Sequence, residues 1–174
     1  MTNTLDLDRI VTGMRAFPEV LRGSLLGTPP ADLRRRPAPE AWSLMEIVGH
    51  VLDEETRDFR ARVRHALDRP GTPLTPIDPE RWVIEREYNA WELEPTLAAF
   101  ARERAESLRC IERIDPSDHG RSAEHPRYGP LRVADLLAAW HAHDLFHLRQ
   151  VGRTRVRLYV QAMSGFNVDY AGTL

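Results

Sequence analysis

Hydrophobic residues recur every three or four positions over most of this chain, which is the period of an amphipathic α-helix. The alternation typical of half-buried strands hardly occurs. Four segments carry the helical period, and proline or glycine residues separate them. They cover approximately residues 5–26, 43–68, 80–114 and 131–151. This pattern predicts an all-α fold, a four-helix bundle whose apolar faces share one core.

Local signals mark the ends of the first two segments. Gly27 and the prolines that follow it end the first segment, and Pro18 inside it is expected to kink the helix or remove one hydrogen bond. Ser43 and Glu46 form a capping box at the start of the second segment. The stretch 71–80, GTPLTPIDPE, contains three prolines and is expected to be an extended loop.

The third segment divides into two helical pieces. Residues 80–91 predict the first piece, and Pro95 suits the first turn of the second. Asp115 and Pro116 end this helix, and the polar residues 117–130 are expected to form a loop.

The fourth segment starts near Leu131 and continues to at least Val151, with Gly152 as its candidate end. We therefore assign residues 1–152 to the bundle domain. Residues 153–174 form a C-terminal tail whose structure the pattern does not assign.

Composition narrows the possible chemistry. The chain has 174 residues, and all 24 basic residues are arginine, which excludes reactions that need a lysine amine. A net charge of −2 argues against general nucleic-acid binding. Cys110 is the only cysteine, so neither an intrachain disulfide nor a cysteine-based zinc site is possible. The early acidic residues and the lack of a long apolar run predict a cytoplasmic protein without a membrane partner.

The histidines carry the strongest chemical signal. His143 and His147 are four residues apart, so they share one face of the fourth predicted helix. On a helical wheel this face also holds Leu136 and Trp140, and it points into the bundle. Asp144 falls within the apolar sector as well. Two inward imidazoles and a carboxylate are costly to bury without partners, and the imidazoles are spaced to bind one metal ion.

His50 is the third candidate ligand. It lies beside Ile47 and Glu54 on the second predicted helix, at the edge of the apolar face. Two ligands from one helix and one from another leave a metal position open, as in catalytic sites. Core histidines that hydrogen-bond to each other or to backbone carbonyls are an equally open interpretation of the sequence. The other four are expected to be solvated or structural: His65, His119, His125 and His141.

Two stretches resemble the signatures of one family. Residues 41–53, AWSLMEIVGHVLD, resemble the W-S-x-x-E-h-x-x-H-h segment of the DinB/YfiT-like metalloenzymes, in which h is a hydrophobic residue. Residues 140–151, WHAHDLFHLRQV, resemble the last-helix signature of these proteins: histidine, three residues, histidine, and then a glutamine. The order, helix placement and separation of the two motifs agree too.

This resemblance implies an up-down-down-up four-helix bundle that is often dimeric. It implies a divalent metal ion, commonly zinc or nickel, held by His50, His143 and His147. The activities known for such proteins are mostly thiol-dependent, and include transfer of thiols such as bacillithiol or glutathione and mycothiol-dependent maleylpyruvate isomerisation. We therefore expect a homodimer that uses a small-molecule substrate and a low-molecular-weight thiol.

The leading hypothesis is therefore a metal-dependent S-transferase or isomerase. Asp144 and Glu54 are its candidate catalytic residues, because a nearby carboxylate can orient an imidazole or accept a proton. Cys110 is expected to pack in or beside the core, so the reacting thiol must come from a cosubstrate. Two alternatives stay open. One is a metal-dependent hydrolase that uses bound water, and the other is a non-catalytic, metal-binding, stress-associated module.

Overall fold

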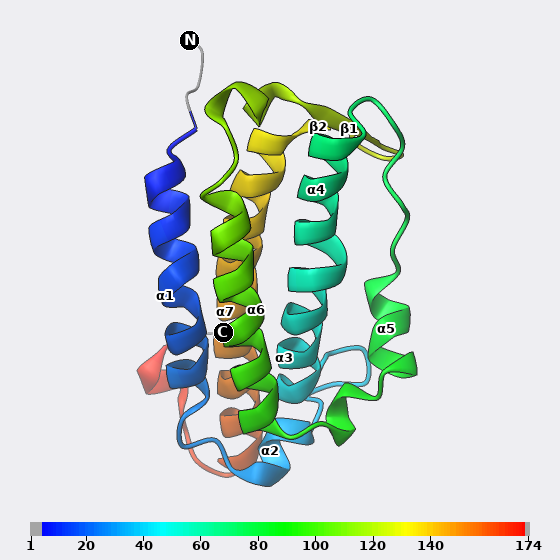
Figure 1. The fold of residues 1–174 in the computed structure, drawn as a ribbon. Coiled ribbons are helices and arrows are strands. Elements are labelled where there is room, and N and C mark those ends of the chain that lie inside the picture. The colour runs from blue at the N-terminus through cyan, green and yellow to red at the C-terminus, as the bar shows by residue number, and fades with distance from the viewer. Residues whose placement is uncertain (1–4, 173–174) are drawn as a thin grey trace.

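The computed structural model describes residues 5–172, which form a bundle of four long helical runs (Figure 1). Within these residues no helix is both long enough and apolar enough to cross a membrane. The predicted all-α four-helix bundle is confirmed. The runs are α1 (Leu7–Leu25), then α3 (Leu44–Asp53) with a π-helical turn (Glu54–Phe59) and α4 (Arg60–Asp68), then α6 (Leu93–Ile111) and α7 (Val133–Ala162).

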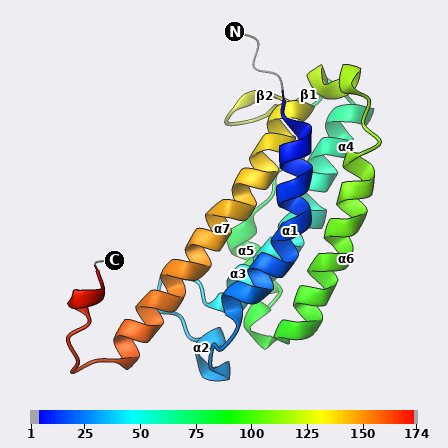
Figure 2. The same ribbon diagram turned by 90° about the vertical axis from the view of Figure 1, so that its left-hand side faces the viewer.

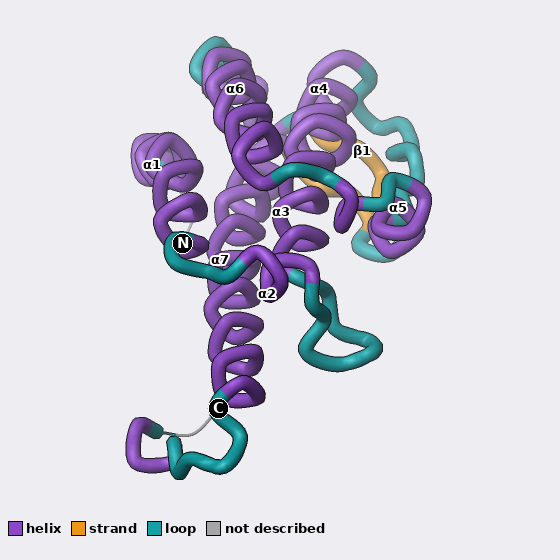
Figure 3. The backbone as a smooth tube through the Cα atoms, turned by 90° about the horizontal axis from the view of Figure 1, so that it is seen from below, coloured by secondary structure: helices purple, strands orange, loops and turns teal. Residues whose placement is uncertain are grey.

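The topology is up-down-down-up. α1 and α7 run in one direction along the bundle, while α3–α4 and α6 run in the other (Figure 1). α1 packs against α6 and α7, and α3 packs against the same two helices, so the four runs surround one core (Figure 3). Because α4 and α6 are parallel, residues 69–92 must return along the outside of the bundle. This connection contains the short helix α5 (Pro79–Glu85).

The apolar stripes face inward, as the helical period predicts. α1 continues through Pro18, which removes one backbone donor without ending the helix. Five side chains of α1 are buried at spacings of three and four: Ile10, Met14, Phe17, Leu21 and Leu25. A second short helix, α2 (Pro30–Arg34), closes the lower end of the bundle (Figure 1).

A layer of buried polar side chains divides the core into two apolar clusters. One cluster contains Phe59 and Trp140, and the other contains Phe100 and Val151. Buried charged residues and histidines lie between or beside these clusters. They include His50, Glu54, Glu55, Arg104, Asp144 and His147, each with less than a tenth of its surface exposed. This layer is where the candidate chemistry of the sequence gathers.

The π-helical turn lies within this layer. The predicted capping box is present at the start of the run, where Ser43 Oγ accepts from the backbone N–H of Glu46 and the Glu46 carboxylate accepts from that of Ser43. From Glu54 to Phe59 the helix widens. A π-helical turn is rare and often accompanies a functional site. The sequence pattern did not predict it.

The region between α6 and α7 differs from the expected loop. Residues 122–125 form strand β1 (Ser122–His125), which pairs antiparallel with β2 (Gly129–Arg132). The connection of residues 69–92, which we call the strap, adds to this hairpin. Leu74 N–H donates to the Glu124 carbonyl at 2.8 Å, and Glu124 N–H donates to the Thr72 carbonyl at 3.0 Å. These pairings between distant segments stabilise strands too short to be evident from alternation alone.

The last helix also differs from the prediction. α7 does not end at Gly152 but continues to Ala162, so the tail whose structure was not assigned begins as helix. A glycine inside a helix costs about 1 kcal/mol relative to alanine. Burial of Thr154 and Leu158 on the following turns offsets that cost. Figure 2 shows the last turns of α7 and the segment after them extending past the other long helices.

Gly49 allows the outer connection to pack against α3. A Cβ atom built at Gly49 would lie 2.5–2.8 Å from three atoms of Tyr88. Tyr88 is fully buried, and its hydroxyl donates to Asp53 Oδ2 at 2.7 Å. We expect Gly49→Ala to destabilise the protein by about 1–3 kcal/mol, because the buried ring cannot move away freely.

Urea denaturation tests this expectation against Gly152→Ala. A Cβ atom at Gly152 would meet no other part of the described chain within 4 Å, so alanine there is expected to stabilise the helix by up to about 1 kcal/mol. A Gly49→Ala protein as stable as the wild type would contradict the close packing of Tyr88.

Candidate metal centre

Three histidine rings from two helices meet in the polar layer. His50 comes from α3, and His143 and His147 come from one face of α7. His147 Nε2 lies 3.1 Å from His50 Nε2 and 2.9 Å from His143 Nε2. One ligand atom of each residue lies within 4.8 Å of the others. The structure therefore brings together all three ligands predicted from the sequence, so that one ion could contact them all.

The electrostatic surroundings keep these rings neutral. Burial, reinforced by the neighbouring His147, lowers the pKa of His50 from 6.5 to about 3. Burial and the other two rings lower the pKa of His143 to about 2. Burial also lowers the pKa of His147. A neutral imidazole presents the lone pair that a cation needs. Three such donors suit zinc, nickel, iron or copper.

Gln150 orients the central ring. Its Oε1 lies 2.7 Å from His147 Nδ1. Because a carbonyl oxygen only accepts, Nδ1 carries the proton and the Nε2 lone pair faces the other two rings. His50 Nδ1 is buried and has no hydrogen-bond partner among the described residues. The donor set and the directed lone pair of His147 both fit a metal ion at the Nε2 atoms.

Glu54 lies beside the histidines, at the start of the π-helical turn. One carboxylate oxygen is 4.0 Å from His50 Nδ1, and the other is 4.0 Å from His143 Nε2. Its Oε1 atom is buried and unpartnered among residues 5–172. Burial raises the pKa of Glu54 from 4.5 to about 7, although the charge of Arg62 works in the opposite direction. A carboxyl group in this position can exchange a proton with a molecule bound next to the three rings.

Asp144 has a different environment from the one predicted. Its carboxylate forms a two-pronged ion pair with Arg104, at 2.6 and 2.8 Å. No hydrogen bond from Asp144 to His143 or His147 occurs within the described residues. One position along an α-helix rotates a side chain by about 100°, which turns Asp144 toward α6. The geometry therefore lends no support to a role for Asp144 in orienting a metal-binding imidazole.

Arg104 also pairs with a second carboxylate. Its Nε and Nη2 atoms donate to Glu55 at 3.0 and 2.8 Å, and its Nη1 donates to the Met14 carbonyl at 3.1 Å. Trp140 Nε1 donates to the same Glu55 carboxylate at 2.9 Å. Arg104 thus links the π-helical turn to the part of α7 that carries the histidines.

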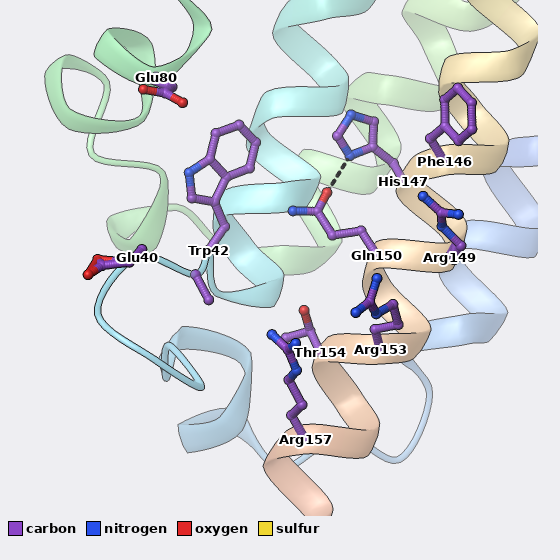
Figure 4. A pocket seen from close by; sticks show the side chains of 11 residues that line it. Glu40, Trp42, Glu80, Phe146, His147, Arg149, Gln150, Arg153, Thr154 and Arg157 are labelled. Atoms are coloured by element: carbon purple, nitrogen blue, oxygen red, sulfur yellow. Dashed lines mark hydrogen bonds between the residues drawn. The ribbon is translucent and has the colours of Figure 1, made fainter. Parts of the chain in front are cut away.

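Two cavities reach the three histidines. The first, of about 670 Å³, contacts His50, Glu54 and His143, and is lined further out by the hairpin turn and the proline-rich strap. The second, of about 550 Å³, contacts His147 and Gln150 and is shown in Figure 4. The histidines are therefore accessible to small molecules from two directions. Cys110 lines neither of these cavities and lies half-buried on α6.

A protein-family model matches most of this chain. The family model described as the DinB superfamily matches residues 14–151, a stretch that contains all three histidines. This chain belongs to the DinB superfamily. The resemblance predicted from the two sequence motifs is thus confirmed. No curated protein matches the chain.

Two solved structures share the fold of this DinB chain. YfiT from Bacillus subtilis, described as a probable metal-dependent hydrolase with an unusual four-helix bundle topology, matches with a TM-score of 0.81 at 14% identity. The match covers 91% of this chain and 90% of YfiT. TT2238, described as a four-helix bundle protein, matches with a TM-score of 0.60 at 22% identity, over 84% of this chain and 98% of that one.

Sequence reasoning overlooked two residues of this DinB site. Gln150 belongs to the second motif, but its bond to His147 follows only from their packing. Arg104 stands on the inward stripe of α6, between Phe100 and Leu108. An arginine at an inward position among apolar residues is a signal in itself, because a buried charge needs partners.

Proposed function

We propose that this DinB-superfamily chain is a metal-dependent enzyme in which a low-molecular-weight thiol is activated for S-transfer or isomerisation of a small-molecule substrate. The observation that carries the proposal is the convergence of three neutral imidazoles beside an accessible cavity. Zinc and nickel are our first choices for the ion, which would be held by His50, His143 and His147. A bound divalent ion lowers the pKa of a thiol or water molecule next to it.

The residues around the ion position have distinct tasks in this proposal. Gln150 holds the His147 ring with its Nε2 lone pair toward the centre. Glu54 accepts the proton that the nucleophile loses, because its carboxylate oxygens lie 4.0 Å from His50 Nδ1 and from His143 Nε2, and Oε1 has no hydrogen-bond partner within residues 5–172. Phe59 and Leu136 line the first cavity and limit the access of water to the reacting groups.

The cysteine content supports an external thiol. Cys110 is the only cysteine of the chain, and its Sγ atom lies 3.8 Å from Glu106 on the surface of α6. It contacts neither of the cavities that reach the histidines. The sulfur nucleophile must therefore come from a cosubstrate.

A metal-dependent hydrolase is the second candidate, and the position of Glu54 supports it as well. A buried carboxylate beside the metal position is equally suited to take a proton from water. YfiT, whose fold this chain shares, is described as a probable metal-dependent hydrolase.

The test measures turnover of the zinc- or nickel-loaded protein on electrophilic and ester substrates, with and without added thiol. We expect turnover that requires the thiol, and a decrease of about 10²–10⁴-fold in Glu54→Gln with metal content unchanged. Hydrolysis without thiol would replace this proposal with the hydrolase. Metal that raises the melting temperature without any turnover would contradict both and favour the non-catalytic module. The homodimer and the cytoplasmic location stay predictions.

A further inference from the structure

The second cavity has an unusual distribution of charge. Arg149, Arg153 and Arg157 project from successive turns of α7, and Trp42 lies across from this helix on the loop before α3 (Figure 4). His147 and Gln150 lie at one end of this cavity. The cavity therefore joins a row of cations to the candidate metal centre.

The three guanidinium groups are not engaged in polar contacts within the part of the chain that the structure describes. Within residues 5–172 none of them forms a hydrogen bond or an ion pair with another side chain or a carbonyl, although Arg149 lies over the Phe146 ring. Arg155, on the same helix, instead donates to the carbonyls of Ser24 and Leu26. Like charges spaced four residues apart destabilise a helix. The mutual repulsion of these three arginines thus destabilises the helix, and a bound anion would remove this repulsion.

We propose that this cavity binds an anionic cosubstrate, a small molecule with at least two carboxylate groups. Its carboxylates pair with Arg153 and Arg157, because the planar guanidinium group of arginine matches the geometry of a carboxylate. Its other end reaches His147. The part of the inference that places the reactive group at the metal rests on the function proposed above. The pairing of carboxylates with arginines does not.

The dimensions of the cavity indicate the size of this molecule. At 1.5 Å per residue, the helix rises by about 9 Å from His147 to Arg153 and by about 15 Å from His147 to Arg157. An extended tripeptide spans about 10 Å. A cosubstrate that reaches from His147 to both arginines is therefore about as long as an extended peptide of three to five residues. The first cavity, which reaches His50 and His143, stays free for the second substrate.

Other features favour a small molecule over a large polyanion. The arginines share their cavity with Trp42 and with two acidic residues, Glu40 and Glu80. Acidic residues there would repel a continuous phosphate backbone but could pair with an amino group of a zwitterionic ligand. The net charge of −2 also disfavours nucleic acid.

The first experiment measures binding of S-methylglutathione, a dicarboxylate that carries no free thiol. Isothermal titration compares the wild type with Arg153→Gln, Arg157→Gln and the double variant, in metal-free and zinc-loaded protein. We expect each single variant to weaken binding by about 10-fold or more, because each loses a charged hydrogen bond. Arg102→Gln is the matched control, since Arg102 is exposed on α6 and lines neither cavity.

Three results would overturn the proposal: no binding to the wild type, equal binding to the double variant, or an equal loss in Arg102→Gln. A fourth would be binding of a 20-base-pair DNA duplex that the double variant loses, without binding of S-methylglutathione. That pattern would assign the arginines to nucleic acid.

The second experiment separates this proposal from the proposed function. Glutathione is added to cobalt-loaded protein, and the thiolate-to-cobalt absorption band reports whether its sulfur reaches the ion. We expect the band in the wild type. In Arg153→Gln, we expect the glutathione concentration that gives half of the maximal band to be about 10-fold or more higher. Failure of the protein to bind metal would contradict the proposed function alone, while absence of S-methylglutathione binding by the wild type would contradict the arginine site alone. Binding of S-methylglutathione without a band would contradict the placement of the reactive end.

Discussion

Replacement of His147 by alanine is expected to abolish stoichiometric binding of a divalent metal ion. The His147 ring is the central one of the three, with its Nε2 atom within 3.1 Å of the Nε2 atoms of both His50 and His143. Loss of a residue that only orients a ligand weakens metal binding by about 10–100-fold, so loss of the ligand itself should exceed about 100-fold. Metal analysis after dialysis and competition with a chelator measure the change.

Two further variants make this prediction selective. Gln150→Ala keeps all three ligands but frees the His147 ring, so it should weaken binding by about 10–100-fold. His119→Ala, in the 3₁₀ turn Pro116–Gly120, should bind metal as the wild type does. Stoichiometric metal in His147→Ala, or a wild type without metal under metal-replete conditions, would refute the three-histidine centre.

Arg104→Met is expected to destabilise the protein by about 3–5 kcal/mol. The substitution leaves the Glu55 and Asp144 carboxylates buried without their cation, and both have only 1% of their surface exposed. An unpaired buried charge is far more costly than the absence of the whole ion pair. The free energy of unfolding in urea measures this effect.

The origin of this loss can be checked by removing the stranded charges. Glu55→Gln and Asp144→Asn, added to Arg104→Met, should recover part of the lost stability, because neutral amides are easier to bury. Arg15→Met is the surface control, since the Arg15–Glu112 pair is largely exposed and should contribute at most about 1 kcal/mol. A loss below about 1 kcal/mol in Arg104→Met would show that the buried ion pairs do not hold the polar layer together.

Several features of this chain were determined locally and could be predicted from the sequence. The inward direction of His143 and His147 follows from their spacing relative to Trp140, because a helix turns by a constant angle per residue. The Ser43–Glu46 capping box likewise depends only on neighbouring residues. The family resemblance rests on the same short motifs, and the match over residues 14–151 confirms it.

Other features depended on segments that are distant in the sequence. α7 continues past Gly152 because Leu158 is buried in the core cluster that contains Phe100 and Val151. The glycine alone therefore did not predict where the helix ends. The hairpin β1–β2 is stabilised by the strap after α4. The orientation of Asp144 toward Arg104 depends on how α6 and α7 pack.

The sequence by itself determined four amphipathic helices, an inward pair of histidines on the last helix and a third histidine on the second helical run. These follow from periodicity and from short motifs, which are local. Only the tertiary structure decided that His50 meets this pair, that Glu54 joins them through a π-helical turn, and that Asp144 does not. The physical reason is that a buried polar side chain takes its position from the partners that satisfy it, and here these partners come from different helices.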